Sequence, residues 1–157
     1  MIGRVLRFVR LPFLLLTIFA VGRFLLGANG VPYAPRGNAV FSIVGLTFVS
    51  SFYFGALSRR LGGFGWGGTL LVGYSIGLYG QILIFLATWL SYAAGIEGSY
   101  FRHWDALNLP EGTVIPMAAA MQARLGGIVV GPLIAIVPAL IGRAVSLLAP
   151  EPPKTTA

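Results

Sequence analysis

The sequence predicts an all-α integral membrane protein with four transmembrane helices. Hydrophobic residues make up 57% of its 157 residues and charged residues only 10%, and four long apolar runs follow one another along the chain. A soluble domain carries about 25% charged residues, so this composition excludes a soluble enzyme and a disordered regulator. The absence of cysteine excludes a disulfide scaffold and thiolate metal sites.

The four apolar runs are the predicted spans. Each is close to the roughly 20 residues that a helix needs to cross about 30 Å of hydrocarbon. We expect helices because lipid offers no partner for free backbone N–H and C=O groups. The spans belong to a single domain, 1–149, and the proline-rich tail 150–157 is expected to be disordered. The predicted spans are 11–27, 39–57, 70–94 and 125–148.

Basic residues predict the orientation. With four spans, one side of the membrane carries seven Lys and Arg, and the other side carries Arg23, Arg36, Arg102 and Arg124. Cytoplasmic loops are enriched in Lys and Arg, so we expect both termini in the cytoplasm of a bacterium, with the bundle in its inner membrane. The net charge of +7 then belongs to these loops, and no nucleic-acid partner is expected. Arg23 and Arg143 lie near the ends of apolar runs, and we expect both to snorkel toward water.

Small residues recur at a spacing of four in the last three runs, which favours close helix packing. Gln81 shares such a stripe, and its carboxamide suits either an interhelical hydrogen bond or a ligand contact. The two prolines of the fourth run either shape the helix or open a cavity by a kink. The predicted packing residues are Gly73, Gly77, Gln81, Gly127, Gly131, Pro132 and Pro138.

The only long loop contains a segment, 98–109, that predicts an amphipathic helix on the outer membrane surface. In a helix, its aromatic and apolar side chains share one face by the i, i+3, i+4, i+7 rule. We expect this helix to cap the bundle and to offer a contact surface for a partner. The interaction candidates are Tyr100, His103, Trp104, Asp105 and Leu107.

Acid–base chemistry, a divalent metal or a haem-like ligand at His103 are the alternatives for this segment, with Asp105, Glu97 or Glu111 nearby in sequence. A helix points positions i and i+2 apart, which separates His103 from Asp105. One histidine cannot provide a recognised zinc spacing. We therefore predict no catalytic residue, no metal site and no enzyme activity.

Three functions remain open from the sequence. The first is a small structural or interaction subunit of a homo- or hetero-oligomeric membrane complex, with lipid or a hydrophobic cofactor packed in its grooves. The second is a small oligomeric transporter or channel whose polar path passes Gln81. The third is a membrane enzyme that acts at the outer interface through His103 and Asp105. The near absence of ionisable residues deep in the spans favours the first, because such residues usually mark pathways.

Overall fold

The computed structural model describes residues 1–33 and 41–149. Within these ranges the chain forms five α-helices and one short 3-10 helix, and no strand. Three helices are long and apolar enough to cross a membrane: α2 (Arg10–Ala28), α4 (Trp66–Ala93) and α5 (Met117–Ser146). The all-helical prediction is confirmed, and these helices suit a membrane protein.

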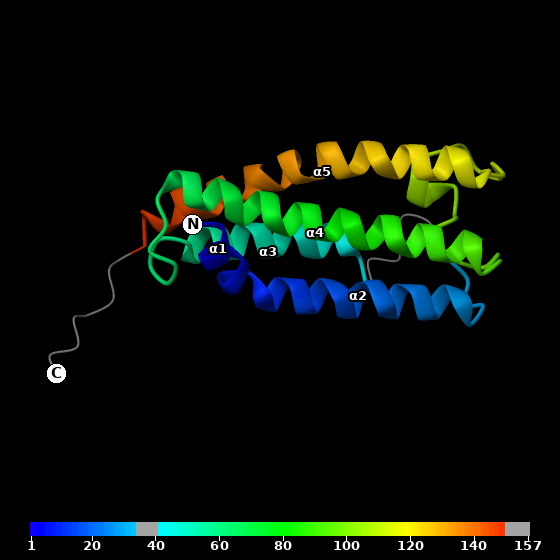
Figure 1. The fold of residues 1–157 in the computed structure, drawn as a ribbon, viewed down its shortest axis with the longest axis horizontal. Helices are drawn as coiled ribbons and strands as arrows, with labels where there is room; N and C mark the ends of the chain where they lie inside the picture. Colours follow the sequence, from blue (N-terminus) through cyan, green and yellow to red (C-terminus); the bar gives the residue numbers. More distant parts are fainter. Residues whose placement is uncertain (34–40, 150–157) are drawn as a thin grey trace, which may run out of the picture.

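The helices run side by side along the long axis, with α4 between α2 and α5 (Figure 1). The N-terminus and the end of α5 lie at the same end of the bundle, which we call the terminal end. The opposite end carries residues 94–116 and is called the loop end. The side of the membrane on which the termini lie stays a prediction.

The first helix, α1 (Ile2–Phe8), was not expected from the sequence, and it turns into α2 at Val9. Pro12 explains the turn. Proline has no N–H for the carbonyl four residues back, at Phe8, and its ring clashes with that carbonyl. Val5 and Val9 are buried, so α1 packs on the terminal end of the bundle.

Helix α3 (Ile43–Leu57) has 15 residues. At 1.5 Å per residue it rises about 22 Å, less than the roughly 30 Å of the hydrocarbon core. Thr47, one turn inside α3, lies against Gly80, which is 14 residues from Trp66 and 13 from Ala93, so α3 begins about one turn from the middle of α4 on the side of the loop end. A complete second span is therefore still a prediction, and residues 39 and 40 of that expected span lie outside the described residues, as does the tail 150–157.

Glycines form the contact of α5 with α3 and α4, which we call the glycine seam: Gly55, Gly73, Gly77, Gly131 and Gly142. A Cβ atom on Gly77 would lie 2.6 Å from Ala135 Cβ and 2.8 Å from Pro132 Cα. On Gly55 it would overlap the Ala139 carbonyl oxygen, and on Gly142 that of Phe52. Only glycine lets these backbones approach so closely.

The expected amphipathic helix at 98–109 is not formed. The segment folds as turns followed by a 3-10 helix, η1 (Asp105–Leu107), which ends at Asn108 with φ of 56°. Tyr100 and Phe101, neighbours in sequence, are both buried, whereas a surface helix would bury one face only. Arg124 binds the Phe101 and Ala106 carbonyls, and these contacts take the place of helical hydrogen bonds.

Candidate functional site

Polar and aromatic side chains gather around Tyr33 at the loop end. The Tyr33 hydroxyl donates to Asp105 Oδ2 at 3.2 Å and accepts from Arg23 Nη2 at 3.3 Å. The Arg23 guanidinium also lies over the rings of Tyr33 and Tyr100, at 5.2 and 5.5 Å from their centroids. Tyr33 therefore links the end of α2 to the loop before α5.

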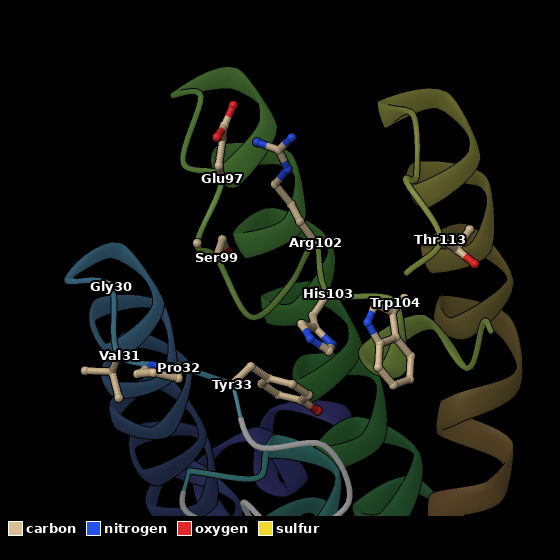
Figure 2. A pocket seen from close by; sticks show the side chains of 11 residues that line it. Gly30, Val31, Pro32, Tyr33, Glu97, Ser99, Arg102, His103, Trp104 and Thr113 are labelled. Atoms are coloured by element: carbon tan, nitrogen blue, oxygen red, sulfur yellow. The ribbon is translucent and has the colours of Figure 1, made fainter. Parts of the chain in front are cut away.

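His103 and Trp104 extend this group, and Figure 2 shows them beside Tyr33. The His103 ring centroid lies 4.2 Å from that of Tyr33 and 4.8 Å from that of Trp104. These residues line a cavity of about 350 Å³ together with Glu97 and Arg102. Three of the predicted interaction residues, His103, Trp104 and Asp105, are brought together here. Tyr100 joins them through its contact with Tyr33, and Leu107 is half-buried in η1.

The chemistry of His103 is limited by its own hydrogen bond. Its Nδ1 accepts from the Asp105 backbone N–H at 3.2 Å, so the neutral ring carries its proton on Nε2. Burial lowers the pKa of His103, Asp105 raises it and Arg23 lowers it further. Within the described residues, no three His, Cys, Asp or Glu side chains are placed to hold a metal ion. The Nδ1 atom of the imidazole is thus used inside its own loop.

Arg124 holds the loop from the side of α5. It donates from Nε to Thr88 Oγ1 at 3.2 Å, from Nη1 to the Ala106 carbonyl at 3.1 Å and from Nη2 to the Phe101 carbonyl at 3.3 Å. Arg23 and Arg124 line one cavity of about 320 Å³, which we call the arginine cavity. Two arginines that are 101 positions apart in sequence therefore meet at the start of α3.

Sequence reasoning missed this pair, since it assigned Arg23 to snorkelling and used Arg124 only to set the orientation. The available signal was an arginine inside or beside an apolar helical run, because such residues in membrane proteins usually face the bundle interior. Arg23 packs on aromatic rings instead of standing free in water. No pattern in the sequence pointed to Tyr33 as part of this site.

Arg143 also differs from the snorkelling prediction, because it is only 6% exposed. Its Nη1 donates to the Phe64 carbonyl at 2.8 Å, and its guanidinium lies 4.8 Å from the Trp66 ring centroid. The chain turn between α3 and α4 thus wraps around this side chain. The arginine fixes that turn to the end of α5.

The predicted packing residues lie along α4 and α5. Gln81 rests over two glycines of α5: a Cβ atom would lie 2.8 Å from Gln81 Oε1 at Gly127, and 2.5 Å from its Nε2 at Gly131. Pro132 is buried against Gly77. Helix α5 continues through Pro132 and Pro138 without a break. It begins at Met117, so residues 117–124, expected outside the last span, belong to the same helix.

Helix α2 meets α4 less closely. An apolar groove of about 210 Å³ lies between them, and a second, of about 350 Å³, lies where α1 and the start of α2 meet α4. Phe24 and Leu86 line the first groove, and Phe13 and Leu78 line the second. One polar contact crosses this interface, between Thr17 Oγ1 and the Tyr79 hydroxyl at 2.8 Å. Apolar grooves of this size on a helix bundle suit acyl chains.

The fold and site define a helical bundle of membrane-spanning length whose loop end is held together by arginine and aromatic side chains. Comparison with protein families, with curated proteins and with solved structures finds no match to this chain.

Proposed function

We propose that this protein is a small structural and interaction subunit of a membrane complex, embedded in a bacterial inner membrane with both termini in the cytoplasm. One observation carries the proposal. The polar side chains at the loop end bind the chain's own loop: Arg124 holds two loop carbonyls, His103 accepts a loop N–H, and Asp105 accepts from Tyr33. Groups used in this way stabilise a surface rather than perform a reaction.

The other two functions receive less support. A proton-transferring histidine needs a free basic nitrogen facing the substrate, and His103 Nδ1 is engaged with Asp105. A polar path past Gln81 needs space beside its carboxamide, but that group packs directly over Gly127 and Gly131. The contact suits an interhelical packing role, worth about 0.6 kcal/mol for a typical polar contact in a membrane.

Lipid and partner chains have separate places in this proposal. The two apolar grooves along α4 accept acyl chains, and we predict no catalytic cofactor. The partner binds the loop end near Trp104, which is half-buried and carries an indole suited to the membrane interface. Large aromatic residues are common anchors of protein interfaces.

Native mass measurement in mild detergent, on protein extracted from its own membrane, tests the proposal. We expect an assembly of fixed stoichiometry that is clearly heavier than the 16.7 kDa chain. Trp104→Ala should release the partner while the helical content stays unchanged. Trp89→Ala is the matched control, because Trp89 lies on α4 with 48% exposure and does not line the cavity beside Trp104. A monomeric wild-type chain, or equal loss of the partner in both variants, would contradict the proposal.

A further inference from the structure

The arginine cavity lies at a particular depth in the bundle. Helices α4 and α5 have 28 and 30 residues, so they rise about 42–45 Å, the thickness of a bilayer with its headgroups. Arg124 is seven residues from Met117, and Ile84 is nine residues from Ala93. At 1.5 Å per residue, these positions are about 10 and 13 Å inside the helix ends. The cavity therefore lies just below the expected headgroup layer.

The charges around the cavity are unbalanced. Arg23 and Arg124 both line it, so two cationic side chains share one cavity. The carboxylate nearest to the pair in the hydrogen-bond network is that of Asp105, which is bound to the Tyr33 hydroxyl and does not line the cavity. Two cations and one anion leave a charge of about +1 in a poorly solvated place, where charges need partners. One phosphodiester group would neutralise it.

Arg23 has unused hydrogen-bonding capacity. In the described part of the chain its guanidinium donates one hydrogen bond, to Tyr33, although a guanidinium carries five N–H donors. Ser42 and Asn108 also line the cavity. Arginine binds phosphate oxygens through paired N–H groups, so the cavity offers the donors that a phosphate requires.

Apolar residues also line the cavity, and they favour a lipid over a free anion as its ligand. Ile43, Val44 and Ile84 also line it. Val44 is 48% exposed on the outer surface of the bundle, so the apolar side continues to the surface that faces lipid. A free anion would lose its hydration against these side chains, whereas a phospholipid would place its glycerol and first methylenes there.

We propose that the arginine cavity, formed where the short helix α3 begins, binds the phosphodiester of one anionic phospholipid through Arg23 and Arg124. This deepens the proposed lipid-packing role and rests on it. Its test uses the isolated chain, so a missing partner subunit does not affect the result. Binding of this kind would also explain why α3 begins short of the loop end: the headgroup and the loop together occupy the position that a longer helix would fill.

Native mass spectrometry of the purified chain tests the cavity with phosphatidylglycerol and phosphatidylcholine of identical acyl chains. We expect one phosphatidylglycerol to bind about tenfold more tightly than phosphatidylcholine. Both lipids carry the phosphodiester, but only phosphatidylcholine also brings a quaternary ammonium cation, which the two arginines repel. Arg23→Gln should remove most of this preference. Arg59→Gln is the matched control, since Arg59 is an exposed arginine at the other end of α3.

A second pair of variants avoids any effect of Arg23 on folding. Val44→Glu places a carboxylate at the mouth of the cavity on an exposed position, and it should lower phosphatidylglycerol binding about tenfold. Val44→Gln, of the same shape without the charge, should bind like the wild type. Equal affinity for both lipids, or unchanged binding in Arg23→Gln and Val44→Glu, would overturn the proposal. Displacement of the lipid by equimolar inorganic phosphate would assign the cavity to free anions and overturn it as well.

Discussion

Two helix interfaces of this molecule are built differently. Across the glycine seam, α5 meets α3 and α4 with backbone close to backbone. Between α2 and α4, side chains such as Phe13 and Tyr79 keep the helices apart, with their ring centroids 4.1 Å apart, and an apolar groove remains. In lipid, helix association depends on packing rather than on the hydrophobic effect. The comparison therefore indicates a firm three-helix unit with a more loosely attached α2.

The largest effect is expected from alanine at Gly55, in the glycine seam. The added Cβ would overlap the backbone of Ala139, and a helix backbone cannot move aside as a side chain can. We expect a loss of about 1–3 kcal/mol in unfolding free energy, measured by denaturation in detergent micelles. Gly126→Ala is the control: no atom lies within 4 Å of its Cβ position, so better helix propensity should leave it as stable as the wild type or more so. Equal stability of the two variants would show that close backbone contact in the glycine seam does not stabilise the bundle.

Gly131→Ala should cost less, at about 1 kcal/mol. The obstacle here is the end of the flexible Gln81 side chain, with Nε2 at 2.5 Å, and this group can rotate away. Gln81→Ala in the same chain should restore most of the loss, so the two changes should be non-additive. Strict additivity in a double-mutant cycle would show that Gln81 does not pack over α5.

Tyr79→Phe tests the looser interface and should cost about 0.6 kcal/mol, the average for such polar contacts in a membrane. The effect is small because Thr17 Oγ1 also donates to the Phe13 carbonyl at 2.9 Å, so the hydroxyl keeps a partner. Leu15→Ile in α2 should be close to neutral, as a volume-conserving change. A loss in Tyr79→Phe as large as in Gly55→Ala would remove the distinction between the two interfaces.

The smallest effect should appear at the loop end, where Tyr33 and His103 tie α2 to the loop. Burial lowers the pKa of His103 below its usual value of 6.5. Below that value the unfolded chain takes up the proton more readily, so stability is lost as pH falls. We expect the thermal midpoint of the wild type to fall between pH 7.5 and 5.5 by more than that of His103→Asn. Identical pH profiles would show that His103 does not contribute to the pH dependence of stability.

Several features of the fold were predictable because their causes are local. Apolar runs of sufficient length predicted α2, α4 and α5 to within a few residues at most ends, and the spacing of Gly73 and Gly77 indicated a packing face. Helix α5 was expected over 125–148, but it begins at Met117 with Pro116 as its N-cap. What the sequence did not show is that residues 117–124 belong to the same helix as the last span.

The loop end was not predictable for the opposite reason. An amphipathic pattern at 98–109 satisfied every rule for a surface helix, but the pattern does not contain the partners that compete for its backbone. Arg124 binds the Phe101 carbonyl, and Gly27 allows the loop to approach α2, where a Cβ atom would lie 2.8 Å from the Tyr100 N. Both partners are remote in sequence, so turns replaced the expected helix.

The sequence by itself determined the class of protein and the positions of its long helices, because hydropathy and helical periodicity act over one or two turns. The tertiary structure alone decided that α3 begins short of the loop end, that Tyr100 and Phe101 are buried together, and that Arg23 and Arg124 share a cavity. These features depend on which surfaces meet when the helices pack. Two arginines 101 residues apart share a cavity because of the fold, and no repeating pattern in the sequence predicts such a contact.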